Sequence, residues 1–195
     1  MPRPTKEEID EEILDAAAAL FARHGVEQTS VQRVADAVGY SKTGLLHRFP
    51  SKEALREATV TSTLERLELL ARRVAALPAG RERDREVLRA MAELATRRPG
   101  LVAFVLTALS SPGSAMSTER LDSIGEVLFR AFGARLEPGA DPERAVRITT
   151  ALGGLAVTSL ACRDLDAALV QPHLLAAALG ALGHPADPPT PRTED

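Results

Sequence analysis

Hydrophobic residues recur at helical spacing along most of the chain, and no stretch alternates between apolar and polar residues as a half-buried strand does. The first apolar stripe runs from Ile9 to Phe21. It follows Thr5-Lys6-Glu7-Glu8, in which the threonine and the last glutamate can satisfy each other's free backbone amides. It precedes Gly25, a residue type that commonly ends helices. The pattern predicts an all-α protein whose first helix extends to His24.

The next three predicted helices occupy residues 29–38, 41–47 and 51–77. A serine or threonine stands at the start of each, where its hydroxyl can accept a hydrogen bond from a free backbone amide. Gly39 and Phe49-Pro50 separate these helices and favour turns. The chain is therefore expected to begin with one long helix, two short helices and a second long helix.

Five further helices are predicted near residues 82–97, 101–110, 118–135, 142–163 and 172–183. Asp141-Pro142-Glu143 is a strong helix start, because it combines a capping acceptor, a proline in the first turn and an acid at the positive end of the helix. Residues 184–195 contain four prolines and few apolar groups, and we expect them to form a disordered tail. The total is about nine helices.

Composition narrows the class of protein. The chain of 195 residues is 45% hydrophobic, yet no apolar run approaches the ~18 residues that a membrane span needs. The acidic start has no apolar stretch of the kind that signal peptides carry. Cys162 is the single cysteine, which excludes an internal disulfide and a zinc site built from several cysteines. We expect a cytoplasmic protein that has no membrane contact and holds no metal or cofactor.

The net charge is −3, but charge is sorted along the first quarter of the chain. Residues 5–15 hold six acids and one lysine. Residues 29–56 hold only two acids against five bases, an excess of three positive charges. The five bases are Arg33, Lys42, Arg48, Lys52 and Arg56. A local basic segment of this kind is typical of a protein that contacts nucleic acid with one small part of its surface.

Two short helices joined by a turn at Gly39 have the arrangement of a helix-turn-helix. The second helix of such a pair lies in the major groove of DNA, with its N-terminal residues at the base edges. The residues that it is expected to expose are Ser41, Lys42, Thr43, Gly44, His47 and Arg48. They offer the donors, acceptors and positive charge that contact with bases and phosphates requires.

Residues 9–58 resemble, without a gap, the N-terminal signature of the Tet-repressor family of transcriptional regulators. The residues that carry the resemblance are Ile13-Leu14-Asp15-Ala16-Ala17, Leu20-Phe21, Gly25, Thr29-Ser30-Val31, Val34-Ala35, Val38-Gly39, Ser41-Lys42 and Phe49-Pro50-Ser51-Lys52-Glu53-Ala54-Leu55. The resemblance implies two domains: a helix-turn-helix DNA-binding domain over residues 1–50, and a ligand-binding and dimerisation domain over residues 51–183.

The resemblance also implies individual DNA contacts. Thr29 and Lys52, each at a helix start, would bind phosphates, and the helix N-terminus at Lys52 would help to hold the anion. The residues that would face DNA from the recognition helix are Ser41, Lys42, Thr43 and His47. The sequence departs from the family at Leu46, where relatives often have a tyrosine that contacts the DNA backbone, and Arg48 would replace that contact.

In the resembled family the fourth to seventh helices enclose a small-molecule pocket. The candidate lining residues here are Leu67, Leu70, Met91, Leu94, Phe104, Leu106, Leu109, Met116, Leu128, Phe129 and Phe132. Aromatic residues make up only 3% of the chain and tryptophan is absent. This composition favours a lipophilic effector over a flat cation that needs aromatic faces.

The segment 142–183 is expected to form the contact of a homodimer. Its small residues, which permit close approach, are Gly153, Gly154, Ala156, Ala161, Ala176, Ala177 and Ala178. Its larger apolar residues, which supply burial, are Val146, Leu152, Leu155, Leu160, Leu174, Leu175 and Leu179. A two-fold dimer would present two recognition helices to a near-palindromic operator.

The function expected from these features is that of a repressor that a small-molecule effector releases from its operator. An activator with the same contacts is an alternative that the sequence does not distinguish. A helical enzyme and a protein–protein adaptor are alternatives of other classes. The four histidines, His24, His47, His173 and His184, are scattered and form no motif with metal-ligand spacing. An adaptor would leave the basic helix pair without a purpose.

Overall fold

The computed structural model describes residues 5–110, 117–135, 139 and 141–184. These residues contain helices and no strand, so the prediction of an all-α protein of about nine helices is confirmed. The helices are α1 (Lys6–His24), α2 (Val31–Ala37), α3 (Lys42–Arg48), α4 (Lys52–Val74), α5 (Arg81–Arg97), α6 (Pro99–Ser110), α7 (Thr118–Ala131), α8 (Pro142–Ala161) and α9 (Ala167–Ala181). None of these helices is both long and apolar enough to cross a membrane.

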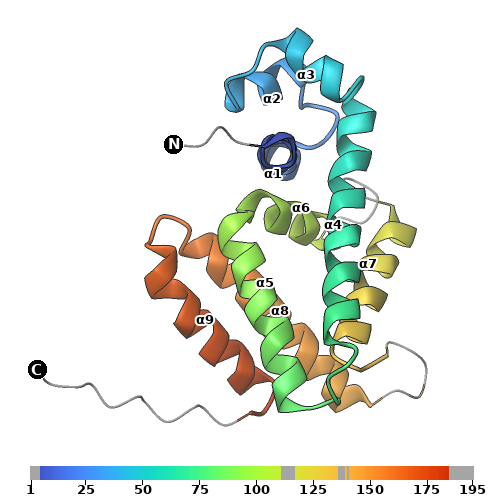
Figure 1. The fold of residues 1–195 in the computed structure, drawn as a ribbon, viewed down its shortest axis with the longest axis vertical. Helices are drawn as coiled ribbons and strands as arrows, with labels where there is room; N and C mark the ends of the chain where they lie inside the picture. Colours follow the sequence, from blue (N-terminus) through green and yellow to red (C-terminus); the bar gives the residue numbers. More distant parts are fainter. Residues whose placement is uncertain (1–4, 111–116, 136–138, 140, 185–195) are drawn as a thin grey trace, which may run out of the picture.

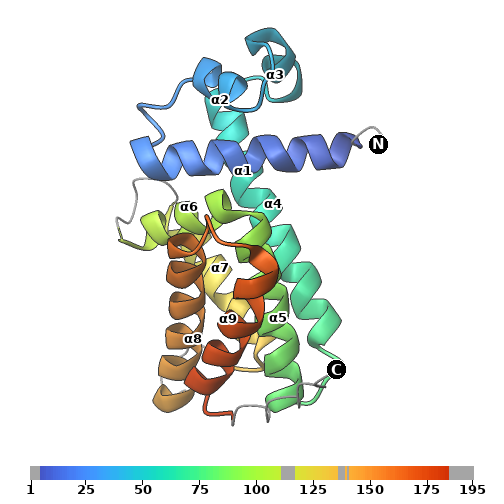
Figure 2. The same ribbon diagram turned by 90° about the vertical axis from the view of Figure 1, so that its left-hand side faces the viewer.

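The helices form a small head on an elongated body (Figure 1). The head consists of α1, α2 and α3, and the body consists of α5 to α9. Helix α4 extends from the head along one side of the body, where it packs against α7. Turned by 90°, the molecule shows α1 lying across the top of α6, with α8 and α9 side by side on one face of the body (Figure 2).

Capping residues position the helices of the head as the sequence predicts. Thr5 and Glu8 form the predicted reciprocal pair, in which the Glu8 backbone N–H donates to Thr5 Oγ1 over 3.2 Å and the Thr5 N–H donates to Glu8 Oε2 over 2.7 Å. Ser41 and Ser51 accept hydrogen bonds from the backbone amides three residues further on, each over 3.0 Å. Side-chain chemistry thus sets where α1, α3 and α4 begin.

Several predicted helix ends were wrong. Helix α7 ends at Ala131 rather than residue 135, and α8 ends at Ala161 rather than residue 163. The last helix begins at Ala167, five residues before the predicted start at Pro172, because the Asp166 carboxylate accepts a hydrogen bond from the Ala168 N–H over 2.9 Å and caps it. Pro172 therefore lies inside α9, in its second turn.

The predicted tail, residues 184–195, begins with a residue that is packed. The His184 ring nitrogen Nε2 lies 2.7 Å from Oδ2 of Asp84, a carboxylate that is fully buried in α5. Arg144 of α8 reaches the same carboxylate with both terminal nitrogens, over 2.9 and 2.6 Å. Residues 185–195 lie outside the described part of the chain. The end of α9 is thus fastened to α5 and α8 through one aspartate.

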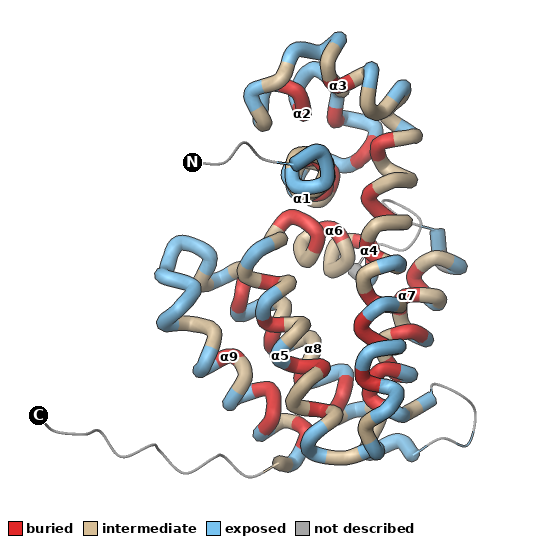
Figure 3. The backbone as a smooth tube through the Cα atoms, in the orientation of Figure 1, coloured by how far each residue is buried: buried red, intermediate tan, exposed pale blue. Residues whose placement is uncertain are grey.

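Helix α1 lies between the rest of the head and α6, and its inner side is buried. Phe21 of α1 packs against Phe104 of α6 with ring centroids 6.0 Å apart, and both side chains are fully buried. Buried positions follow the inner sides of α1, α4 and α5 in Figure 3. Asp15 Oδ1 accepts a hydrogen bond from the Leu101 N–H over 3.0 Å, so an α1 side chain caps the start of α6. Burial raises the pKa of this carboxyl above its ordinary value, and its hydrogen bonds to the α6 backbone offset part of that effect.

The predicted division between residues 50 and 51 falls at the start of α4. Helix α4 contacts α1 in the head as well as α5 and α7 in the body, and α1 packs extensively on α6. The head and the body are therefore continuous through two packed helices, α1 and α4. The division into two domains stays a prediction.

The contact between α1 and α6 at Gly100 generates a prediction. A β-carbon at this position would overlap the Asp15 carbonyl oxygen and lie 3.0 Å from the Ala19 backbone nitrogen, both of which are main-chain atoms that cannot move aside. We expect Gly100→Ala to lower the free energy of unfolding by ~1–3 kcal/mol, measured by urea denaturation, because the two helices must separate.

Gly180→Ala is the matched control for this substitution. Gly180 also lies inside a helix, α9, but a β-carbon there would meet no atom within 4 Å. Alanine should stabilise the protein at this position by roughly 0.5–1 kcal/mol, since glycine is the poorer helix former. Equal responses of the two variants would contradict the proposed contact at Gly100.

Candidate nucleic-acid interface

Helix α3 lies at the end of the molecule that is farthest from the body (Figure 1). Leu45 is fully buried and anchors the helix to the head. Thr43 and His47, one turn apart, are exposed on the same side of the helix, and Lys42 is exposed beside them. Three of the predicted DNA-facing residues are thus brought together on one open surface.

Ser41 belongs to the same surface but has a structural task as well. Its side chain is exposed, and its hydroxyl oxygen accepts the Gly44 N–H over 3.0 Å, which caps α3. The hydroxyl retains a proton that it can donate to an acceptor on DNA. Gly44 is half-buried, and a β-carbon there would lie 3.1 Å from Ser41 Oγ. The small residue therefore leaves room for the cap.

The turn between α2 and α3 sets the angle of the recognition helix. Gly39 has φ +70°, a left-handed conformation that favours glycine. The next residue, Tyr40, donates its backbone N–H to the Ala35 carbonyl over 2.9 Å, which closes the end of α2. The helix-turn-helix predicted from the sequence is therefore present, with its turn at the expected residue.

Arg48 and Lys52 hold the helices of the head together. The Arg48 guanidinium forms an ion pair with Asp10 of α1, and the side chain is mostly buried. The Lys52 ammonium donates to the Glu27 carbonyl over 3.1 Å and lies 3.6 Å from the Glu27 carboxylate. Each keeps further N–H groups, so the phosphate contacts expected of them stay predictions.

The phosphate role predicted for the Thr29 side chain was wrong for this conformation of the head. Thr29 is only 2% exposed, and its hydroxyl donates to the carbonyl oxygens of Gly25 and Leu20, over 2.8 and 3.3 Å. Ser30, one residue later, is the exposed residue that caps α2, by accepting the Arg33 N–H over 3.1 Å. Thr29 ties the turn after α1 to the start of α2.

Three basic side chains gather beside the start of α2, and the sequence reasoning assigned none of them a DNA contact. The pKa of His24 is lowered, first by desolvation and then by the positive charges of Arg33 and Arg23. Arg23 and Arg33 are both exposed. The basic segment counted from residue 29 therefore also includes Arg23 and His24 at the end of α1. The spacing of residues along the sequence does not show that these side chains lie near Arg33.

Comparison with known proteins agrees with this geometry. Residues 13–59 match the model of the family described as bacterial regulatory proteins, tetR family. The matched segment contains all of α2 and α3 and the parts of α1 and α4 that pack against them. The chain belongs to the tetR family.

Two curated relatives in this family illustrate where the similarity lies. HTH-type transcriptional repressor KstR2 of Rhodococcus jostii (strain RHA1) is 41% identical over 56 residues, which is 29% of this chain and 28% of that protein. HTH-type transcriptional regulatory protein RaaS of Mycobacterium tuberculosis is 30% identical over 146 residues, 73% of this chain and 66% of that protein. The matches thus span roughly a quarter to two thirds of the relatives' own lengths.

The fold of the whole chain is similar to that of a solved structure. The crystal structure of a TetR-like transcriptional regulator from Rhodococcus sp. RHA1 aligns with a TM-score of 0.58, over 93% of this chain and 99% of that chain. The sequence identity is 16%, so the similarity extends to the fold alone. The head-and-body arrangement is therefore shared with that solved structure.

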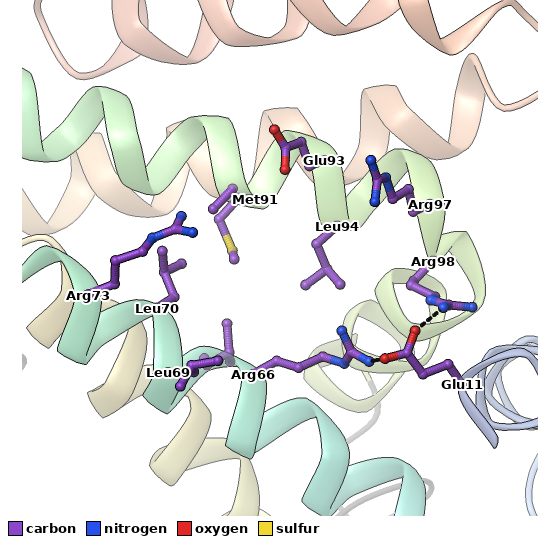
Figure 4. Close-up of a pocket in the computed structure, with 12 residues that line it drawn as sticks. Glu11, Arg66, Leu69, Leu70, Arg73, Met91, Glu93, Leu94, Arg97 and Arg98 are labelled. Atoms are coloured by element: carbon purple, nitrogen blue, oxygen red, sulfur yellow. Dashed lines mark hydrogen bonds and ion pairs between the residues drawn. The ribbon is translucent and has the colours of Figure 1, made fainter. Parts of the chain in front are cut away.

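The body of this tetR-family chain contains a cleft of about 310 Å³ between α4 and α5 (Figure 4). Four of the predicted pocket residues, Leu67, Leu70, Met91 and Leu94, line it. The lining is less lipophilic than expected, because charged residues share it. They are Glu11, Arg66, Arg73, Glu93, Arg97 and Arg98.

The other predicted pocket residues do not share this cleft. Phe104, Phe129 and Phe132 are buried in the core, and Leu128 packs against it. Leu109 is exposed, Leu106 is half-buried without lining the cleft, and Met116 lies outside the described residues. Four of the eleven candidates thus line this cleft, since helical spacing identifies apolar positions without separating a core from a pocket.

The place of Thr29 generates a prediction that separates structure from DNA contact. Thr29→Val keeps the shape of the side chain but removes the hydroxyl that bonds to two carbonyls. We expect the free energy of unfolding to fall by ~1 kcal/mol. The slope of log Kd against log salt concentration for DNA should stay unchanged, because no phosphate contact is lost. A shallower slope with unchanged stability would restore the phosphate role.

Proposed function

We propose that this chain is a DNA-binding transcriptional regulator, a repressor that leaves a near-palindromic operator when a small-molecule effector binds. The observation that carries the proposal is the outer face of α3, where Lys42, Thr43 and His47 stand exposed on a helix anchored by buried Leu45. Membership of the tetR family supports it. An activator would make the same contacts with DNA, so the direction of control is part of the proposal.

The chain acts as a homodimer through α8 and α9. Four of the six exposed large hydrophobic side chains among the described residues lie on these helices or the turn between them. They are Val146, Val157, Leu165 and Leu169. Exposed apolar side chains gathered on one face are typical of an interaction surface. A groove of about 840 Å³ with a mainly apolar lining runs between the two helices on that face.

The residues that serve the dimer overlap in part with those first expected. Leu155, Leu174, Ala178 and Leu179 are already buried in the monomer. Gly154, Ala161 and Ala177 lie on the helix face left open, together with Val157, Thr158 and Leu169. Two antiparallel helices from each protomer packed by this face would bury it in a self-complementary interface.

Two heads held by one dimer would enter successive major grooves of the operator, which lie about 34 Å apart. An effector that binds better to a dimer whose heads have another spacing would then lower the affinity for DNA. The cytoplasm is the natural compartment, since the operator is there and the thiol of Cys162 stays reduced. The alternatives of an enzyme and an adaptor protein would require neither sequence-specific DNA binding nor its dependence on salt.

The first test of the proposal concerns the reading of bases. Thr43→Ala and His47→Ala should each change the preferred operator in a selection from random DNA, with discrimination at a contacted base pair falling by roughly 1–3 kcal/mol. Lys42→Ala should weaken binding to all sequences and flatten the salt dependence by about one charge.

Arg163→Ala is the control for these variants, because Arg163 is exposed in the turn that follows α8, outside the head. It should leave both the consensus and the salt slope as in the wild type. A wild-type protein that enriches no sequence, or the same consensus from the Thr43, His47 and wild-type proteins, would contradict base reading by α3.

The second test concerns the dimer. Gly154→Glu places a charge on the open face of α8, where a β-carbon meets no atom of the same chain within 4 Å. We expect a monomer that keeps its helix content and loses most of its operator affinity, because one half-site loses the gain from linking two heads. Light scattering and a mobility-shift titration measure the two effects.

Leu69→Glu is the matched control for the dimer test. Leu69 is also an exposed apolar residue, but it lies on α4, away from α8 and α9. This variant should stay dimeric. Dissociation by Leu69→Glu, with Gly154→Glu still dimeric, would move the interface to another face and leave DNA reading by α3 intact.

A further inference from the structure

The cleft between α4 and α5 combines an apolar wall with a charged end (Figure 4). Leu70 of α4 and Met91 and Leu94 of α5 line its middle. At one end the side chain of Glu11 reaches in from α1 and meets Arg66 and Arg98. Its volume of about 310 Å³ lies at the small end of the range that drug-sized ligands occupy.

Positive charge is in excess in this lining. Four arginines and two glutamates contribute to it, which leaves two positive charges uncompensated within the cleft. Arg73 has a partner outside the cleft, the Glu86 carboxylate, at 3.1 Å, so this carboxylate offsets one of the two charges. Arg97 is exposed and forms no ion pair within the described part of the chain. A cationic ligand would be repelled here, whereas an anion would be attracted.

Glu11 holds two guanidinium groups with one carboxylate. Its Oε1 pairs with Arg66 of α4, and its Oε2 pairs with Arg98, the residue that joins α5 to α6. The pKa of Arg66 is lowered by partial burial and by the nearby positive charge of Arg98. Two neighbouring cations attract an incoming anion, and a ligand carboxylate has the same planar geometry toward the two guanidinium groups as the Glu11 carboxylate that it would replace.

We propose that this cleft binds a small amphipathic carboxylate, whose apolar tail lies along Leu70, Met91 and Leu94 and whose anionic group displaces Glu11 from Arg66 and Arg98. The site follows from the cleft itself. Its effect on DNA rests on the proposed function. Release of Glu11 removes the ion pairs that fasten α1 to α4 and to the junction of α5 and α6.

The neighbour of Glu11 connects this event to the recognition helix. Asp10 pairs with Arg48 of α3 within the head. Of two consecutive acids of α1, one therefore binds the helix that faces DNA and the other binds the arginines of the cleft. A ligand that competes with Glu11 therefore acts one residue away from the contact that positions α3. Linkage between two binding sites is reciprocal. DNA that favours the head orientation in which Glu11 pairs with Arg66 and Arg98 would therefore weaken binding of the carboxylate.

The test measures binding of hexanoate, octanoate and decanoate to the full chain without DNA, by isothermal titration calorimetry, with octan-1-ol as the uncharged probe. We expect saturable binding of at least one carboxylate and at least tenfold weaker binding of octan-1-ol. Arg66→Gln and Arg98→Gln should each weaken binding of that carboxylate at least tenfold. Glu11→Gln should strengthen it severalfold, because the competing charge is gone.

Arg72→Gln is the control, since Arg72 is an exposed arginine of α4 that does not line the cleft. It should bind the carboxylate as the wild type does. Circular dichroism confirms that each variant is folded, and the two arginine variants test the same end of the cleft independently. No saturable binding of any carboxylate, equal binding of octan-1-ol, or weaker binding by Glu11→Gln would overturn the proposal.

A second stage separates this proposal from the proposed function. The bound carboxylate is added to the complex of wild-type protein and selected DNA, and to the same complex of Glu11→Gln. Release of the wild type with a smaller response of the variant supports the linkage. If the protein binds a carboxylate through Arg66 and Arg98 but selects no DNA sequence, the proposed regulator function is overturned and the proposed ligand site stands. If it selects a DNA sequence but binds no carboxylate, the ligand site is overturned and the regulator function stands.

Discussion

The orientation of α3 relative to the body depends on how α1 is held between α3 and the helices of the body. Three acids on this one helix make the connections: Asp10 pairs with Arg48 of α3, Glu11 pairs with Arg66 and Arg98, and Asp15 caps the start of α6. Apolar burial on the other side of α1, centred on Phe21, supplies the packing that these polar contacts orient. The head cannot tilt on the body without changing at least one of the three, so the orientation of α3 is set by the whole chain.

Local chemistry made the head largely predictable. The capping residues, the turn at Gly39 and the exposed face of α3 depend on neighbours within a few residues, and the structure has them where the sequence indicates. Errors arose where the spacing of apolar residues does not decide the structure. Helix α9 begins five residues before Pro172 because Asp166 caps an earlier start, and Thr29 is buried because the end of α1 supplies carbonyl acceptors for its hydroxyl. Neither fact is visible in the spacing of apolar residues.

The candidate ligand site was predictable only in part, because the spacing of apolar residues does not show which helices the fold brings together. Apolar periodicity found the leucines and the methionine of the cleft, but it gave equal weight to Phe104 and Phe132, which fill the core. The charged end of the cleft comes from a residue of α1 and one at the junction of α5 and α6, which only the fold brings together. In the sequence, the acids of residues 5–15 appear only as a local excess of negative charge. In the structure, they form part of the connection between head and body.

Whether the chain represses or activates depends on which orientation of the head the ion pairs of Glu11 favour. Partly exposed ion pairs such as those of Glu11 contribute little to overall stability, because solvent screens them. They can still bias an equilibrium between two orientations of the head, since a shift of about 1.4 kcal/mol changes the ratio of the two states tenfold. If the tied orientation fits the operator, a ligand that takes the place of Glu11 releases the DNA and the chain is a repressor. If the freed orientation fits, the same ligand makes it an activator. One ion-pair cluster thus suffices for either outcome, and the geometry of the operator selects between them.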